Sequence, residues 1–137
     1  MFNILVVDDL AEFKVSSALN HLKNCGIKFK CEYAETVNEA NRYIKNHSDS
    51  IHLIILDLGL PLIQGGDYDP LNGLYVLQFM KRYKIKIPVI INSSTAIPDE
   101  QDLLEECSDA SLVVKHVSSL EGDWLKQFIF NTIIKKQ

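Results

Sequence analysis

Several features that would place this chain in other protein classes are absent from its sequence. It has three cysteines among 137 residues and no Cys-x-x-Cys pair. This pattern predicts neither a disulfide framework nor a zinc site, and it fits a reducing, cytoplasmic location. The first apolar run meets two aspartates almost at once, and no apolar run is long enough to span a membrane. We therefore expect neither an export leader nor a membrane segment.

An excess of positive charge is absent as well. The chain has 14 Lys and Arg against 18 Asp and Glu, a net charge of -4, with no basic stripe. Such a surface repels a phosphate backbone, so nucleic-acid binding is not expected. Repeats and low-complexity segments are also missing, and 47% hydrophobic with 23% charged residues is typical of a globular protein. The length predicts one domain, residues 1–137, with no linker to an effector domain.

Five short apolar runs predict β-strands, and each is followed by a helical pattern. The expected strands cover residues 2–7, 27–33, 51–56, 87–92 and 111–114. The expected helices run from about Phe13 to Asn24, from a capping box at Thr36 and Glu39, over 73–83, over 98–107, and from a capping box at Ser118 and Glu121. Strands that alternate with helices predict a parallel sheet with helices on both faces.

Polar side chains follow four of these strands at the point where each strand ends. Asp8 and Asp9 follow the first, Asp57 ends the third, Ser93 follows the fourth and Lys115 follows the fifth. Right-handed crossovers bring the carboxyl ends of parallel strands to one edge of the sheet, where ligands bind. We expect these side chains to lie together at that edge.

The three aspartates carry the chemistry of this predicted site. Carboxylates crowded together repel each other unless a cation lies among them. Magnesium prefers a few oxygen ligands, so Asp8, Asp9 and Asp57 predict a Mg²⁺ site. Beside such an ion, Asp57 is a carboxylate nucleophile suited to accepting a phosphoryl group. Lys115 and a hydroxyl after the fourth strand would bind the phosphoryl oxygens.

Four segments together resemble response-regulator receiver domains of the chemotaxis-regulator type. They are residues 4–9 (ILVVDD), 53–61 (LIILDLGLP), 88–93 (PVIINS) and 113–115 (VVK). Their order and spacing cover essentially the whole chain. The resemblance implies a flavodoxin-like α/β fold, whose five-stranded parallel sheet has the order 2-1-3-4-5 and helices on both faces.

The resemblance also implies a role for each residue of the site. Asp57 matches the phosphoacceptor, Lys115 the lysine that pairs with the phosphate, and Ser93 the switch hydroxyl, although Ser94 and Thr95 also offer hydroxyls. The implied Mg²⁺ ligands are Asp8, Asp9, Asp57 and the backbone carbonyl of Gly59. A histidine kinase or phosphotransfer protein would supply the phosphoryl group, and phosphorylation would change binding to a downstream protein. Self-phosphorylation and self-dephosphorylation would be the chain's only enzymatic activities.

Three departures from the family pattern leave other readings open. His116 stands where the family usually has proline, Leu112 stands where it commonly has Tyr or Phe, and the 62–72 connection is unusually long. A pseudo-receiver that binds partners without phosphate is therefore an alternative. A magnesium-dependent phosphatase is a weaker one, because such enzymes carry a second aspartate at the position of Gly59.

The last predicted helix is apolar around nearly its whole circumference. Its apolar residues are Leu120, Trp124, Leu125, Phe128, Ile129, Phe130, Ile133 and Ile134. One-sided packing needs only a stripe, so the surplus predicts a contact surface. We expect a partner or a second copy of the chain to meet this helix through Trp124, Phe128 and Phe130.

Overall fold

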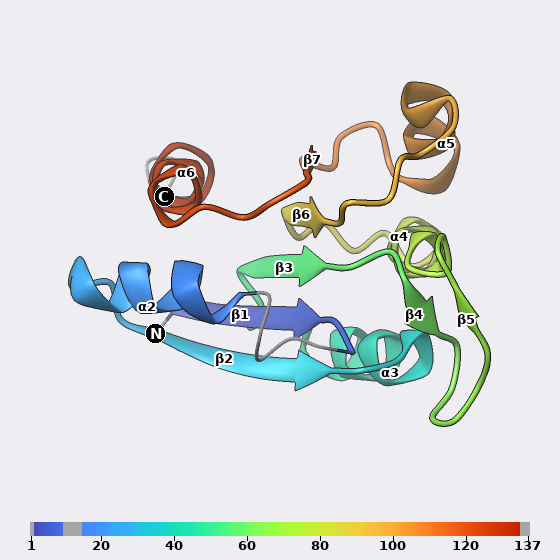
Figure 1. The fold of residues 1–137 in the computed structure, drawn as a ribbon, viewed down its shortest axis with the longest axis horizontal. Helices are drawn as coiled ribbons and strands as arrows, with labels where there is room; N and C mark the ends of the chain where they lie inside the picture. The colour runs from blue at the N-terminus through green and yellow to red at the C-terminus, as the bar shows by residue number, and fades with distance from the viewer. Residues whose placement is uncertain (1, 10–14, 135–137) are drawn as a thin grey trace.

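The computed structural model describes residues 2–9 and 15–134, and its centre is a parallel sheet (Figure 1). The strands are β1 (Phe2–Val7), β2 (Phe29–Ala34), β3 (Leu53–Leu56), β6 (Val89–Asn92) and β7 (Val114–Val117). They are ordered β2-β1-β3-β6-β7, and every neighbouring pair is parallel. The predicted sheet and its order are confirmed.

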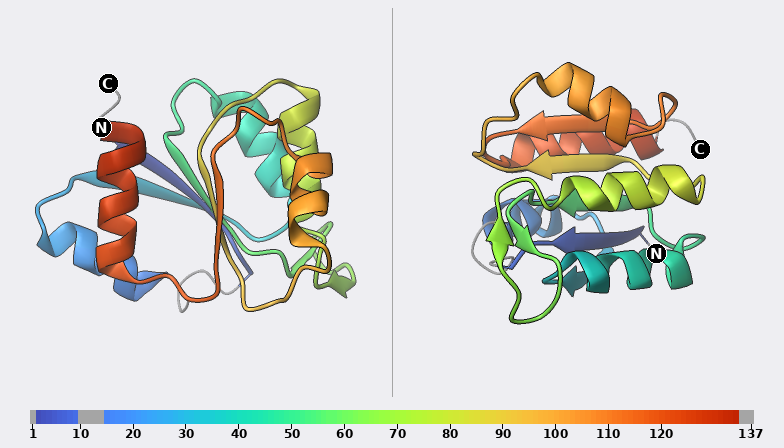
Figure 2. Two further views of the ribbon diagram at one scale, coloured as in Figure 1. Left: turned by 90° about the horizontal axis from the view of Figure 1, so that it is seen from above. Right: turned by 90° about the vertical axis from the view of Figure 1, so that its right-hand side faces the viewer.

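The helices lie on both faces of the sheet, as Figure 2 shows. They are α2 (Ser16–Asn24), α3 (Val37–His47), α4 (Leu74–Arg82), α5 (Glu100–Cys107) and α6 (Gly122–Ile129), which continues as the π-helix η1 (Phe130–Ile134). Helices α2 and α6 pack together on one face, and α3, α4 and α5 cover the other. The predicted start of the first helix near Phe13 lies outside the described residues. None of the described helices is both long enough and apolar enough to cross a membrane.

The core consists of two layers because the central strands are covered on both sides. In β1, Ile4 and Val6 face α2 and α6, whereas Leu5 and Val7 face the other helices. This alternation follows from the pleat of the strand. All four residues are at most 1% exposed. Full burial of one such side chain contributes about 1.5–3 kcal/mol, so the continuous apolar runs stabilise the sheet from both faces.

The predicted position of the last strand is wrong. We expected residues 111–114, but β7 spans Val114–Val117. The side chain of Asp109 accepts hydrogen bonds from the backbone nitrogen and the hydroxyl of Ser111, at 2.8 and 2.7 Å. The backbone N–H of Leu112 also donates to the carbonyl of Asp109. Since these bonds form a turn, the chain enters the sheet three residues later than the apolar pattern indicates.

One of the two predicted capping boxes forms its side-chain cap. The hydroxyl of Thr36 accepts a hydrogen bond from the backbone N–H of Glu39 at 3.1 Å, which caps α3 as expected. The second prediction is wrong, because α6 begins at Gly122 and its N-cap, Glu121, makes no side-chain cap bond. A Cβ on Gly122 would lie 2.5 Å from the Cβ of His21, so this glycine lets α6 begin close against α2.

The long connection after β3 contains a small antiparallel hairpin that the sequence did not predict. Its strands are β4 (Leu60–Pro61) and β5 (Tyr68–Asp69). The side-chain amide of Asn72 donates to the carbonyl of Leu60 at 2.8 Å, and the backbone N–H of Asn38 donates to the carbonyl of Leu62 at 3.0 Å. We call residues 60–69 the β4–β5 hairpin. It lies beyond the carboxyl end of β3 (Figure 1).

Candidate functional site

Asp8 and Asp57 lie side by side where β1 and β3 end. Val7 is paired with Leu56 in the sheet. Asp8 directly follows Val7, and Asp57 directly follows Leu56. The backbone N–H of Asp57 donates to the carbonyl of Val7 at 2.8 Å, which continues the sheet to this point. Both side chains are buried, at 2% and 5% exposure. The sheet register therefore brings two buried carboxylates together.

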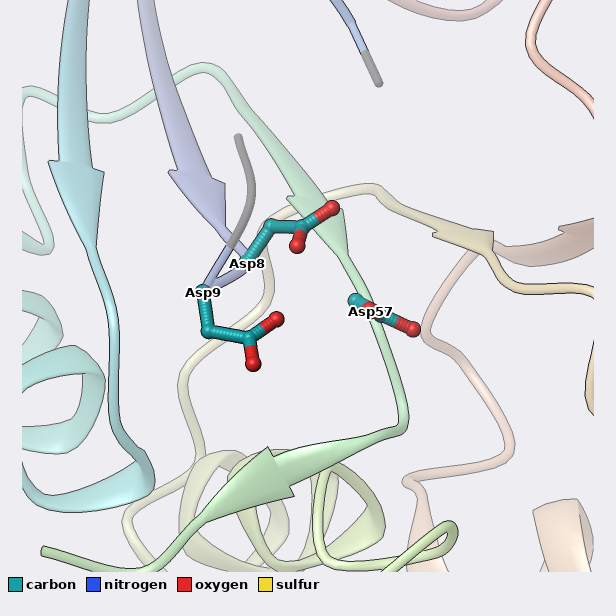
Figure 3. Close-up of side chains that lie close together, drawn as sticks. All are labelled: Asp8, Asp9 and Asp57. Atoms are coloured by element: carbon teal, nitrogen blue, oxygen red, sulfur yellow. The ribbon is translucent and has the colours of Figure 1, made fainter. Parts of the chain in front are cut away.

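Asp9 completes a cluster of three carboxylates, shown in Figure 3. Ligand oxygens of Asp8, Asp9 and Asp57 all lie within 4.8 Å of one another, and Asp9 is exposed. At this separation two unit charges repel by roughly 3 kcal/mol at an effective dielectric constant near 20. A hard divalent cation removes this repulsion, and three carboxylates form the oxygen-only ligand set that Mg²⁺ prefers. The residues present therefore fit the predicted metal.

Two glycines determine the backbone next to Asp57. The N–H of Gly59 donates to the side chain of Asp57 at 3.3 Å. A Cβ on Gly73 would lie 2.5 Å from the carbonyl oxygen of Asp57 and 2.6 Å from the Cα of Leu58. The N–H of Gly73 donates to the carbonyl of Leu58 at 2.7 Å, so α4 begins directly against this segment. Sequence reasoning did not identify Gly73 as a residue of the site. The pattern that could have identified it is a glycine directly before the apolar repeat of α4.

Ser93 is buried at the end of β6, as expected for a residue of this edge. It is 5% exposed, and its backbone N–H donates to the carbonyl of Val117. Its hydroxyl oxygen accepts a hydrogen bond from the N–H of Thr95 at 3.2 Å. Ser94 is exposed and Thr95 is half-buried. Ser93 is therefore the buried hydroxyl residue of the three, and its side chain also stabilises the following turn.

Asn92 is a site residue that sequence reasoning missed. The pairing of Leu56 with Ile91 places Asn92 beside Asp57 on the next strand. Ile55 and Ile90 pack into the same core layer, so strand alternation puts Asp57 and Asn92 on one face of the sheet. Asn92 is 6% exposed. An amide at the end of an otherwise apolar strand is the signal that could have identified it.

Lys115 does not follow the last strand, which corrects its predicted position. It lies within β7, opposite Ile90, two residues before Val117. Val113 and Val117 pack toward α2 and α6, so alternation places Lys115 on the face that carries Asp57. The residue is exposed. Its pairing with a phosphoryl group stays a prediction that requires the long side chain to reach toward the edge.

His116 links the loop that carries Ser93 to α5. Its Nε2 donates to the carbonyl oxygen of Ser93 at 2.9 Å, and its Nδ1 contacts the carboxylate of Glu100. Both ring nitrogens therefore face hydrogen-bond acceptors. The residue that replaces the usual proline therefore forms a specific contact beside the site.

Three groups with a shifted pKa lie in β2, in α3 and in the turn before β7. Burial raises the pKa of the Cys31 thiol and of the Tyr43 phenol. Hydrogen bonds from the side chain and the backbone of Ser111 lower the pKa of the Asp109 carboxyl.

Solved structures of similar shape include receiver domains. A signal receiver domain from Vibrio parahaemolyticus is 21% identical, with a TM-score of 0.70 over 97% of this chain and 90% of that one. CheY from Borrelia burgdorferi, solved as a CheX-CheY-BeF3-Mg complex, is 22% identical, with a TM-score of 0.66 over 95% and 87%. The beryllofluoride-activated NtrC4 receiver domain dimer is 22% identical, with a TM-score of 0.67 over 100% of both chains.

Comparison of the sequence itself adds no family assignment. No protein-family model matches it, and no curated protein matches it. At identities near 20%, the structural likeness establishes the fold and leaves the activity to be argued from the site. The architecture, the sheet order and the extent of the match agree with the resemblance found in the sequence. This chain has the fold of the CheY-like response-regulator receiver domains.

Proposed function

We propose that this protein is a phosphorylation-controlled binding module whose phosphoacceptor is Asp57. The observation that carries the proposal is the carboxylate cluster of Asp8, Asp9 and Asp57, which lies at the carboxyl edge of a receiver fold. This edge is where open α/β sheets bind their ligands. Phosphorylation adds negative charge and acceptor oxygens there, and such a change alters which surface a partner protein recognises.

The transfer needs a nucleophile and groups that bind the phosphoryl oxygens. A carboxylate oxygen of Asp57 forms a bond to phosphorus, and the bond from phosphorus to the donor breaks, its electrons leaving with the donor. Asp8, Asp9, Asp57 and the carbonyl of Gly59 would hold Mg²⁺, which offsets negative charge on the phosphoryl oxygens. We propose that Ser93 and Lys115 bind the phosphoryl oxygens, and that Lys115 does so as a cation.

The proposed donor is a histidine kinase or a phosphotransfer protein, and the proposed target is a downstream protein. The similar CheY structure is a complex with another protein, CheX, which supports protein partners. We place the protein in the cytoplasm because its three cysteines are free and none is paired. Self-phosphorylation and self-dephosphorylation are its only proposed enzymatic activities, and we treat residues 1–137 as one domain.

A second copy of the chain is the proposed partner of the last helix. Trp124, Phe130 and Ile134 are 36%, 42% and 41% exposed, which supports a contact surface. The prediction was wrong for Phe128, which is 8% exposed and stacks on Trp124 with a centroid distance of 5.4 Å. The similar NtrC4 receiver domain is a dimer, which is consistent with self-association.

Incubation with Mg²⁺ and acetyl phosphate, followed by intact mass measurement, tests the phosphoacceptor. The wild-type chain should gain one phosphoryl group, and Asp57→Asn should gain none because it lacks the nucleophilic carboxylate. Asp49→Asn is the matched control, since Asp49 is exposed and lies outside the cluster. If no phosphoryl group is gained from acetyl phosphate or from phosphoramidate, the proposal fails.

A pseudo-receiver is the alternative that one specific observation favours. Lys115 lies within β7 rather than at the edge beside Asp57, so its pairing with a phosphoryl group requires a reach along the sheet. In this alternative the fold binds its partner without phosphate, and Asp57→Asn leaves partner binding unchanged. A phosphatase is less well supported, because Gly59 offers no acid or base for turnover.

A further inference from the structure

The β4–β5 hairpin places an aromatic ring against the backbone that follows Asp57. A Cβ added to Gly59 would lie 2.2 Å from the hydroxyl oxygen of Tyr68 and 2.7 Å from its Cε2 and Cζ atoms. Real Cβ atoms do not approach other atoms so closely, so the ring occupies the volume that any side chain at residue 59 would need. The ring of Tyr68 therefore packs directly against Gly59.

The ring packs against a glycine that lies between two core residues. Leu58 and Leu60 are 0% exposed and pack into the core beside α3 and α4. Gly59, between them, is turned away from that core. Asp57 precedes Leu58, projects from the opposite face of the sheet and accepts a hydrogen bond from the N–H of Gly59. The phenol of Tyr68 therefore packs against the second residue after Asp57.

Backbone and side-chain bonds hold the hairpin in this position. Pro61 is the sheet partner of Tyr68, and Leu60 is the partner of Asp69. The buried amide of Asn72 donates to the carbonyl of Leu60 at 2.8 Å. The carboxylate of Asp69 accepts a hydrogen bond from the N–H of Leu71 at 2.9 Å. Tyr68 is 62% exposed, and its backbone is held next to β4 by this pairing.

We propose that the ring of Tyr68 shields the phosphoryl group on Asp57 from water, an inference that rests on the proposed function. In hydrolysis a water oxygen forms a bond to phosphorus and the bond from phosphorus to the Asp57 oxygen breaks. The electrons return to the carboxylate, and phosphate leaves with the protons of the water. The ring of Tyr68 covers one approach to this centre and lengthens the lifetime of the acyl phosphate.

The lifetime of the phosphoryl group tests the shield. The chain is loaded with acetyl phosphate and Mg²⁺, the donor is removed on a desalting column, and the phosphorylated fraction is followed by intact mass. Loss of the phosphoryl group should be roughly tenfold faster in Tyr68→Ala than in wild type. Tyr68→Phe keeps the ring and should stay close to wild type. Tyr83→Ala, an exposed tyrosine that follows α4, is the matched control and should not change the rate.

A double-mutant cycle tests the contact without any phosphoryl group. Gly59→Ala should lower the melting temperature in wild type, because the new methyl must displace the ring of Tyr68. In the Tyr68→Ala background the same change should lower it clearly less, since neighbours in contact do not behave additively. Circular dichroism confirms that each variant is folded. Additive shifts would overturn the placement of Tyr68 on Gly59.

The outcomes separate this inference from the proposed function. A wild-type chain that gains no phosphoryl group overturns both proposals. A chain that is phosphorylated but loses the group at the same rate in Tyr68→Ala and in wild type overturns the shield alone. The shield and its steric basis are supported if Tyr68→Ala loses the phosphoryl group faster than wild type while Tyr68→Phe stays near wild type. The melting-temperature shifts of the double-mutant cycle should then be non-additive.

Discussion

The Nε2 atom of His116 lies 2.9 Å from the carbonyl oxygen of Ser93. Ser93 follows β6 at the edge that carries Asp57, and the other ring nitrogen of His116 contacts Glu100 in α5. One side chain therefore connects the loop after β6, the last strand of the sheet and a surface helix. A change in the position of Ser93 has a direct physical route to α5.

Replacement of His116 should loosen this connection. We expect His116→Ala to lower the free energy of unfolding by about 1 kcal/mol, because it removes a partly buried hydrogen bond. Amide hydrogen exchange should rise in residues 93–100, and urea denaturation gives the stability. His47→Ala, which removes an exposed ring at the end of α3, is the control. Equal exchange of the 93–100 segment in both variants would contradict the link.

Gly73 should not tolerate a side chain. Its added Cβ would meet backbone atoms of Asp57 and Leu58, which cannot move aside as a flexible side chain can. We expect Gly73→Ala to destabilise the fold by about 3 kcal/mol and to slow phosphorylation by acetyl phosphate. Gly26→Ala is the comparison. Gly26 has a φ of +84° and open space around it, so we expect a loss of about 1 kcal/mol there. Similar phosphorylation rates in the two variants would count against the role of Gly73.

Magnesium should stabilise the fold through the carboxylate cluster. At a concentration one hundred times the dissociation constant, a bound ion adds about 2.7 kcal/mol to the free energy of unfolding. Asp8→Asn should lose most of this gain, because one of the three carboxylates is removed. Thermal melts with Mg²⁺ and with EDTA measure the difference, and Asp49→Asn should respond like wild type. A full Mg²⁺ gain in Asp8→Asn would place the ion elsewhere.

The cysteines should react with iodoacetamide in an order set by exposure and pKa. Cys25 is exposed, Cys31 is half-buried with a pKa raised by burial, and Cys107 is buried. The thiolate is the reactive form, so at pH 8 Cys25 should be alkylated first and Cys31 more slowly. Raising the pH toward the raised pKa should speed the reaction of Cys31. Peptide mass mapping over time measures each rate, and urea should remove the differences. Equal rates for Cys25 and Cys31 in the folded chain would be the contrary result.

Self-association should depend on the exposed part of the last helix. We expect Phe130→Glu to shift the sedimentation of a concentrated sample toward the monomer, because a charge cannot be buried at an apolar contact. Tyr83→Glu, which adds the same charge at an exposed aromatic residue elsewhere, should leave sedimentation unchanged. A wild-type chain that sediments as a monomer at high concentration would rule out this contact.

Local sequence patterns were sufficient for much of this structure. The apolar run of residues 2–7 forms β1 with the predicted bounds, and Thr36 caps α3 as its spacing with Glu39 indicates. The expectation that Asp8, Asp9 and Asp57 meet followed from strand order alone, because parallel strands end at one edge. The strand and the cap depend on residues that are close in sequence. The meeting of the aspartates depends on the sheet order, to which there are few alternatives.

Other features were decided only when distant segments packed together. The turn at Asp109 and Ser111 shifts β7 and places Lys115 inside a strand, although the apolar run predicted a strand that ended before it. No local pattern marks Asn92 as the neighbour of Asp57, or Tyr68 as the ring that fits against Gly59. The sequence alone determined the sheet and the identity of its acids, because these follow from periodicity and strand order. The tertiary structure decided the surroundings of Asp57, since these depend on register and close packing between segments far apart in the chain.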